Sequence, residues 1–205
     1  ERSRGLGDVY KRQDTFIIPK FYEDFKMDNV QAQTGLPYAK IPLLRREEVL
    51  LARAEAFALT GRYQDALNDL NIWTALRADA TEYVYGKHVL YKDLLLSHYS
   101  ADLANEDHFI NSRYNAAKFT ATGDELRFQK ALILAILDAR KLEFLREGIR
   151  HFDILRWFIP VYHATADGQR SELTPEDDRR VIQLPQVVSL SGVEQNPWSN
   201  VGAWY

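Results

Sequence analysis

Near the end of its longest helical pattern, the sequence reads Arg140-Lys141-Leu142-Glu143-Phe144-Leu145-Arg146-Glu147-Gly148-Ile149-Arg150-His151-Phe152-Asp153-Ile154-Leu155-Arg156-Trp157. Three of these residues, Arg140, Glu143 and Glu147, are spaced at i, i+3 and i+7, so they share one face of a helix. Gly148 is predicted to end that helix, because glycine adopts the left-handed conformation after a last helical turn without steric cost. The segment therefore predicts a helix whose final turns carry an ion-pairing face.

A second, shorter helix is predicted after the glycine, and it repeats the same spacing of charges. Arg150, Asp153 and Arg156 follow one another at intervals of three residues. Phe144 and Ile149 lie on the same faces as these charges, so the charged groups belong to a partly apolar contact. We therefore expect a partly buried ion-pair network that holds the two helices together. Such networks fix geometry more reliably than they add stability.

The boundaries of these two helices are also marked in the sequence. Thr122-Gly123-Asp124-Glu125 fits the capping box, in which the threonine and the glutamate satisfy each other's exposed amide groups. The long helix is predicted over about 124–147, and its apolar run Ala131–Leu137 is far shorter than the roughly 20 residues that span a bilayer. The short helix is predicted over 149–158, because Pro160 stops it.

Another pair of helices is predicted after Pro42. Four apolar residues at i, i+3, i+7 and i+10 predict the buried face of the first helix: Val49, Ala52, Ala56 and Leu59. Gly61 is expected to end it. The second helix is predicted to place four residues on one side: Ala66, Leu67, Leu70 and Trp73. This helix–turn–helix unit resembles one tetratricopeptide repeat, and a single unit cannot bury both of its faces.

The segment quoted first resembles the C-terminal signature of the SusD/RagB family, E-R-x-x-E-F-x-x-E-G-x-R-x-x-D-L-x-R. The matching residues are Arg140, Glu143, Phe144, Glu147, Gly148, Arg150, Asp153 and Arg156. Ala139 departs from the usual first glutamate, and Ile154 stands where leucine is commoner.

Two further motifs in the expected order strengthen this resemblance. The stretch Ile41–Ala56 is similar to the family's P-x-x-R-x-x-E-x-x-L-x-x-A-E-A helix, with Arg46, Glu48 and Glu55 among its charged residues. The stretches 182–186 and 195–197 are similar to the closing P-I-P and Q-N-P elements. Any one of the three motifs alone is weak.

The resemblance implies a mostly α-helical chain with tetratricopeptide-like helical pairs and long irregular loops. It implies a protein that captures glycans or other nutrients on the extracellular face of the outer membrane, held there by a lipid anchor. Its expected partners are a SusC-like TonB-dependent transporter and an oligosaccharide or other nutrient ligand. This chain would then be mainly the helical scaffold. The alternative is a free-standing tetratricopeptide scaffold that grips a peptide, which predicts further repeats of about 34 residues.

The chain is expected to fall into two parts. Residues 1–13 lack apolar periodicity and are predicted to be a non-native or disordered leader, with a native flexible linker as the alternative. Residues 14–205 are predicted to be the C-terminal part of a SusD-like helical domain, so that the lipid-bearing cysteine would precede them.

Irregular stretches are expected between the helices. Aromatic-rich residues 14–38 are predicted to form an extended connection, because Pro19, Gly35 and Pro37 interrupt regular structure. Residues 108–122 are predicted to be a loop, and 180–185 read as a β-like run.

Composition narrows the function classes. Hydrophobic residues make up 46% and charged residues 27%, which is typical of a globular chain and not of a disordered one. The net charge of −3 and the interleaved signs argue against nucleic acid as a partner. There are no cysteines, which excludes disulfides, thiolate metal sites and a cysteine nucleophile within this sequence.

No catalytic, metal or cofactor site is predicted. Glu143 and Glu147 could be read as a general acid and base, but the arginines around them favour the ionised carboxylates, which is the wrong direction for an acid. Their four-residue spacing with His151 suggests a metal site, yet the Glu-x-x-His pairs of a di-metal bundle are missing and Gly148 interrupts the helix. We expect a binding protein and not an enzyme.

Aromatic residues remain the candidates for stacking on sugar rings. Trp73 and Trp157 lie in helical patterns and are predicted to belong to the core. The aromatic residues in less regular stretches are Tyr83, Tyr85, Trp198 and Trp204. Since tyrosine and tryptophan are also ordinary packing residues, no ligand-binding residue is assigned.

Overall fold

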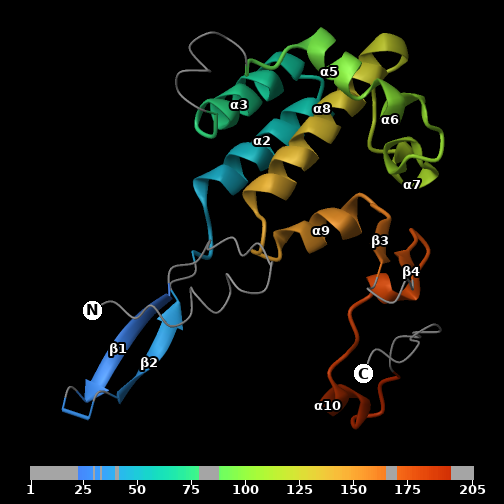
Figure 1. The fold of residues 1–205 in the computed structure, drawn as a ribbon. Coiled ribbons are helices and arrows are strands. Elements are labelled where there is room, and N and C mark those ends of the chain that lie inside the picture. The colour runs from blue at the N-terminus through green and yellow to red at the C-terminus, as the bar shows by residue number, and fades with distance from the viewer. Residues whose placement is uncertain are drawn as a thin grey trace. The chain divides into compact units, whose positions relative to one another are not determined.

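The computed structural model describes residues 23–29, 31–32, 34–39, 42–78, 88–164 and 170–194. The chain divides into two units, one ending at Arg45 and one beginning at Arg46. The first unit contains a β-hairpin, and the second is a helical body (Figure 1). Helices dominate the described residues, so the predicted mostly α-helical class is confirmed. Residues 1–13 lie outside the described residues, and the proposed division at residue 14 stays a prediction.

The hairpin of the first unit pairs β1 (Glu23–Asn29) with β2 (Thr34–Ala39) in antiparallel register, with Phe25 opposite Pro37 and Met27 opposite Gly35. The expectation of an irregular connection was therefore wrong for these two segments. Proline is tolerated here because both strands of a two-stranded sheet are edges. Glycine is required at position 35 because the two strands approach closely there. A Cβ on this residue would lie 2.2 Å from the carbonyl oxygen of Lys26.

The helical body contains helices of very different length and one small hairpin. Its elements are α2 (Arg46–Leu59), α3 (Tyr63–Ala75), α5 (Lys92–His98), α6 (Ser100–Ala104), η1 (Phe109–Asn111), α7 (Arg113–Ala116), α8 (Gly123–Glu143), α9 (Ile149–Arg156), β3 (Val161–Ala164), β4 (Arg170–Leu173), η2 (Asp178–Arg180) and α10 (Gln186–Ser189). The short helices η1 and α7 occupy part of the stretch 108–122, where a loop was predicted.

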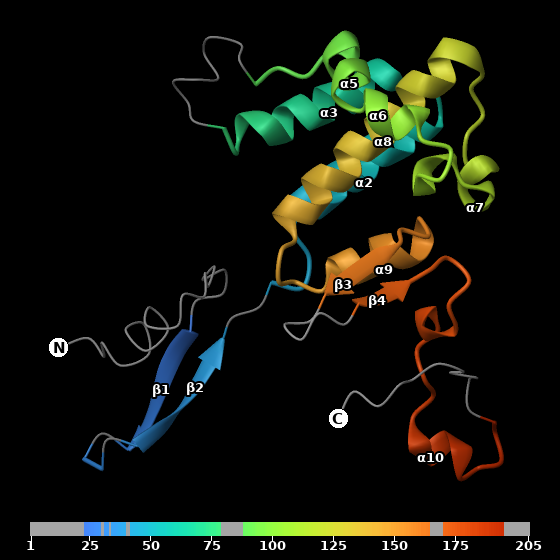
Figure 2. The same ribbon diagram turned by 45° about the vertical axis from the view of Figure 1, so that its right-hand side comes forward.

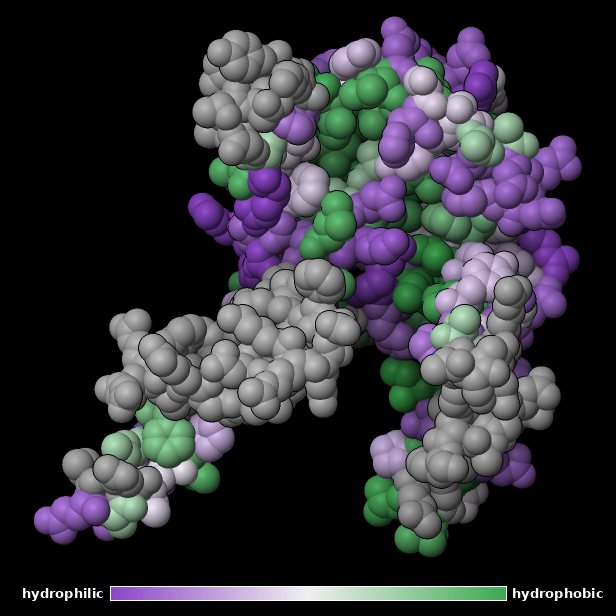
Figure 3. Space-filling model, in the orientation of Figure 1, coloured by the Kyte–Doolittle hydropathy of each residue, from purple (hydrophilic) through white to green (hydrophobic). Residues whose placement is uncertain are grey.

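Helix α8 is the centre of this body. Helices α2, α3 and α5 all contact it, and α2 and α8 lie side by side in both ribbon views (Figures 1 and 2). Its apolar run Ala131–Leu137 is buried throughout. Some large apolar side chains, among them Ile72 and Leu142, nevertheless reach the surface, and apolar and hydrophilic side chains are mixed on the face shown in Figure 3.

Helices α2 and α3 form the predicted hairpin, and Gly61 between them adopts φ +79°. The face that α2 buries differs from the predicted one. Leu51, Ala54 and Ala58 are fully buried, whereas Val49 is 56% exposed and Ala52 and Ala56 are exposed as well. Alanines occupy two neighbouring faces of this helix, and the face that includes Leu51 is buried in the core that α2 builds with α3 and α8.

The long helix α8 ends at Glu143, four residues before the predicted boundary. The chain then turns through Arg146 (φ +66°) and Gly148 (φ +78°) before α9 begins. Thr122 does occupy the N-cap position of α8, but its side chain makes no capping hydrogen bond. The predicted capping box is therefore wrong in its threonine half.

The region after α9 also differs from the prediction, because 180–185 do not form a strand. β3 and β4 pair in antiparallel fashion instead. The guanidinium of the buried Arg180 donates to the carbonyl oxygens of Ile154, Ile159, Leu173 and Thr174. Arg180 therefore connects β4 to the end of α9 through hydrogen bonds.

Candidate functional site

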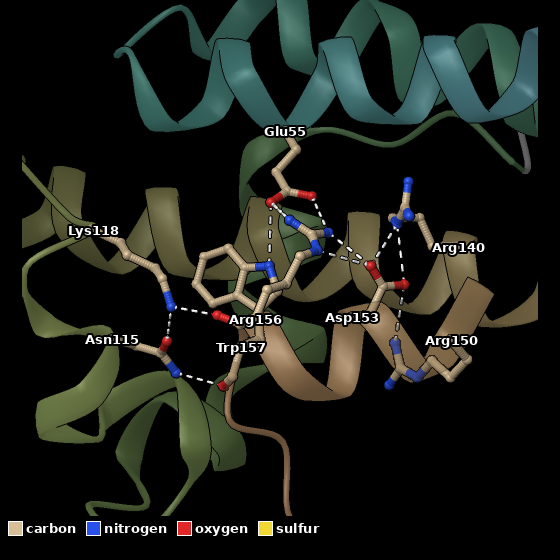
Figure 4. A network of polar contacts seen from close by, with 8 residues as sticks. All are labelled: Glu55, Asn115, Lys118, Arg140, Arg150, Asp153, Arg156 and Trp157. Atoms are coloured by element: carbon tan, nitrogen blue, oxygen red, sulfur yellow. Dashed lines mark hydrogen bonds and ion pairs between the residues drawn. The ribbon is translucent and has the colours of Figure 1, made fainter. Parts of the chain in front are cut away.

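Four charged residues from three helices meet beneath α2. We call them the charged cluster: Glu55 from α2, Arg140 from α8, and Asp153 and Arg156 from α9 (Figure 4). All four belong to the motifs quoted from the sequence. The turn through Gly148 reverses the chain, and this brings α9 back toward the last part of α8.

Asp153 is the centre of the charged cluster and has no exposed surface. Its two carboxylate oxygens accept hydrogen bonds from Nε of Arg140 at 2.9 and 3.1 Å. Nε and Nη2 of Arg156 donate to Oδ1 at 3.0 and 2.8 Å. Nη1 of Arg150 forms a longer ion pair with Oδ2 at 3.9 Å. One buried carboxylate thus faces three guanidinium groups.

Glu55 extends the charged cluster to α2. Its carboxylate binds both terminal nitrogens of Arg156, with 2.6 Å between Nη2 and Oε2. The indole Nε1 of Trp157 donates to Oε1 of the same carboxylate at 3.2 Å. Arg156 therefore links α2 to α9 through two carboxylates, and the ion-pair network expected between the last two helices also includes a third.

The environment shifts the pKa values of Arg156 and Arg150 in opposite directions. Burial would lower the pKa of Arg156, but the hydrogen bonds and negative charges of Glu55 and Asp153 outweigh it and raise that pKa. Burial lowers the pKa of Arg150, against the opposing charge of Asp153. Paired groups of this kind hold helices in a defined geometry, because breaking one pair leaves a buried charge uncompensated.

A second layer of contacts, which no sequence motif indicated, holds α7 against the end of α9. Nδ2 of Asn115 donates to the carbonyl oxygen of Trp157 at 2.8 Å, and Nζ of Lys118 donates to that of Arg156 at 2.6 Å. Lys118 also lies 4.7 Å from the centre of the Trp157 ring. These carbonyls belong to the last turn of a helix, where backbone acceptors need partners from outside the helix.

Glu143 belongs to a separate contact, although it was predicted to share a face with Arg140. Nε and Nη2 of Arg77 donate to its two oxygens at 2.7 and 2.9 Å, and Nε1 of Trp73 donates at 3.0 Å. The hydrogen bond to Glu143 raises the pKa of Arg77 above its usual value. This contact joins the end of α3 to the end of α8.

The remaining motif residues lie around these contacts. Arg46 and Glu48 are in the first turn of α2, where Arg46 is exposed and Glu48 is half-buried. Glu147 and Gly148 lie in the turn after α8, so Glu147 no longer shares a helical face with Glu143. Trp73 and Trp157 pack with the core, while Tyr83, Tyr85, Trp198 and Trp204 lie outside the described residues. The signature role of the motif residues stays a prediction.

Among the described residues, no three histidine, aspartate or glutamate side chains come together to hold a metal ion. Within the same residues, no helix has both the length and the apolar character needed to cross a membrane.

Comparison with known proteins gives one match. A sequence model described as SusD family matches residues 10–180, which include the charged cluster and leave the stretches 182–186 and 195–197 outside. Neither the curated proteins nor the solved structures contain a match to the chain. Because the family match covers far more than half of the sequence, the chain belongs to the SusD family.

Proposed function

We propose that this chain works in the capture of glycans or other nutrients at the outer membrane, together with a SusC-like TonB-dependent transporter. Members of the SusD family are nutrient- or glycan-binding components associated with the outer membrane, and they are binding proteins and not enzymes. The family match over residues 10–180 is the observation that carries the proposal. We also propose that the protein lies on the extracellular face of this membrane and is held there by a lipid anchor.

Within this function, the chain serves mainly as a helical scaffold. The charged cluster supports this role, because it joins α2, α8 and α9 through paired charges around the buried carboxylate of Asp153. The Arg77–Glu143 contact fixes α3 to α8 in the same way. A surface that binds a ligand or a transporter needs supporting elements whose positions do not change.

Binding to a panel of immobilised poly- and oligosaccharides tests the proposal. We expect the chain to retain at least one glycan class, and to co-purify with a TonB-dependent transporter from outer membranes. The matched control is Asp153→Asn, which should lower thermal stability and reduce both interactions together. A folded chain that retains no glycan and no transporter would contradict the proposal, and retention of peptides alone would favour a peptide-binding scaffold.

A further inference from the structure

A mostly apolar pocket of about 250 Å³ lies between α3, α5 and α8, and both α3 and α5 contact α8 (Figure 2). The buried side chains of Leu70, Ala135 and Ala139 belong to its lining, and so do the exposed side chains of Leu94 and Leu142. The volume is somewhat below the roughly 300–1,000 Å³ of pockets that take drug-sized molecules, so the pocket suits a ligand with a single ring system.

Hydrogen bonds fix two of the walls of this pocket. Nδ2 of Asn71 donates to the carbonyl oxygen of Leu90 at 3.0 Å, and the amide of Leu90 donates to Oδ1 of Asn71 at 2.7 Å. Leu90 is thereby attached to α3. The indole Nε1 of Trp73 donates to Glu143, which orients the ring of Trp73 in another part of the lining. These walls are in place before a ligand arrives, and such preorganisation lowers the cost of binding.

Asp138 brings a carboxylate to this apolar surface. The hydroxyl of Tyr99 donates to Oδ2 of Asp138 at 2.8 Å. Burial and the negative charge of Asp138 raise the pKa of Tyr99, so the hydroxyl stays protonated and remains a donor. Within the described part of the chain, no donor is bound to Oδ1 of Asp138. Because the residue is exposed, this second oxygen is available to a ligand.

The charge of the lining favours a cation. Among the described residues that line the pocket, Asp138 carries the one carboxylate, there is no lysine or arginine, and His98 is the one basic side chain. Cations are also attracted to the faces of aromatic rings, and the rings of Trp73 and Tyr99 line the pocket. An anionic ligand would be repelled by Asp138. A sugar would find few polar side chains for its hydroxyl groups.

The charged groups next to the pocket are paired with each other. Glu143 accepts two hydrogen bonds from Arg77. Arg150 is close enough for the charge of Asp138 to act on it, but its guanidinium donates to a backbone carbonyl of α8 and pairs with Asp153. Neither arginine lines the pocket, so the carboxylate of Asp138 remains for a cationic ligand.

We propose that this pocket binds a small aromatic amine, with its ring among the leucines and Trp73 and its ammonium group on Oδ1 of Asp138. The proposal goes beyond the capture of glycans and does not depend on it, because the pocket is mostly apolar.

The test is calorimetric titration of the full chain with tryptamine and with indole-3-propionate. The two compounds share an indole ring and a two-carbon linker and carry opposite charges. The titrations are made at about pH 8, where histidine is ordinarily neutral. We expect tryptamine to bind with a Kd of about 1 mM or below and indole-3-propionate to bind at least about tenfold more weakly, because only the amine donates a charged hydrogen bond to the carboxylate.

Two matched variants locate the ammonium group. Asp138→Asn keeps an acceptor for Tyr99 and removes the charge, so tryptamine should bind at least about fivefold more weakly and the preference over indole-3-propionate should disappear. Asp93→Asn removes the same charge from an exposed position of α5 outside the lining, and both affinities should stay within about twofold because exposed, distant charges are screened.

Circular dichroism verifies that both variants fold. Equal affinities of the wild type for the two compounds, or tryptamine binding that is unchanged in Asp138→Asn, would overturn the proposal. Absence of tryptamine binding at about 10 mM would overturn it as well. A peptide with tryptophan and lysine that binds where tryptamine does not would assign the pocket to a protein partner and also overturn it. Retention of glycans is measured separately, so each of these outcomes leaves the proposed function as it stands.

Discussion

The two faces of α2 carry similar residues and meet different surroundings. The inner face, formed by Leu51, Ala54 and Ala58, is fully buried in the core that α2 builds with α3 and α8. The outer face, formed by Val49, Ala52 and Ala56, is exposed, and its two alanines line a surface pocket of about 290 Å³. Alanine is common to both faces, so composition does not distinguish them. The periodicity of apolar residues therefore locates the helix, whereas the neighbouring helices determine which face is buried.

The largest effect is expected from removing the buried anion that pairs α9 with α8 and, through Arg156, with α2. Asp153→Asn leaves Arg140 and Arg156 without their shared carboxylate in a buried site, so the free energy of unfolding should fall by about 3–5 kcal/mol. Urea denaturation measures the change. The control is Asp65→Asn, which breaks the exposed Arg62–Asp65 pair and should cost at most about 1 kcal/mol. Similar losses in both variants would contradict the role given to the cluster.

A pair of identical substitutions compares the two faces directly. Ala58→Leu adds volume to a fully packed position and should destabilise the protein by about 1–3 kcal/mol. Ala56→Leu adds the same atoms on the exposed side, and its effect should stay within about 0.5 kcal/mol. Thermal denaturation of both variants shows the difference, and a reversed order would mean that the outer face is covered.

A smaller effect is expected at the turn that brings α9 back to α8. Gly148 has φ +78°, and a Cβ at this position would meet no atom within 4 Å. The cost of Gly148→Ala is therefore one of backbone conformation alone, about 1–2 kcal/mol in the free energy of unfolding. Gly148→Asn should cost less, because asparagine tolerates the left-handed region. An unchanged stability in the alanine variant would mean that this turn is not held as described.

The smallest effect is expected from the titration of His108. This residue is tested because the charged cluster contains no histidine. Burial lowers the pKa of His108, and the negative charge of Asp102 opposes this only in part. The neutral ring accepts a hydrogen bond from the amide of Ile110. Since the folded pKa lies below the ordinary 6.5, this stabilisation is present above pH 6.5 and is lost as the pH falls toward the lowered value.

The thermal midpoint of the wild type should therefore drop slightly more than that of His108→Gln between about pH 7 and about pH 5.5. Equal drops in the two proteins would show that His108 does not contribute.

Much of the helical body could be predicted from the sequence, because glycines and apolar spacing mark the α2–α3 hairpin and α8. An ion-pair network between α8 and α9 was also expected, since both helices carry regularly spaced charges and are joined by a short turn. Contacts between residues that are far apart in the sequence could not be predicted. Glu55 and Arg156 are separated by 101 positions, and Glu143 and Arg77 by 66. The β1–β2 hairpin was missed because Gly35 and Pro37 are signals against regular structure except at a sheet edge.

A double-mutant cycle tests most directly whether Glu55 and Arg156 hold α2 to α9 through their partly buried ion pair. The free energy of unfolding is measured for the wild type, Glu55→Gln, Arg156→Gln and the double variant. We expect a coupling of about 1–3 kcal/mol, because each single substitution leaves a charged partner behind. Additive losses, with a coupling near zero, would contradict it and leave the two residues as neighbours without a clamping role.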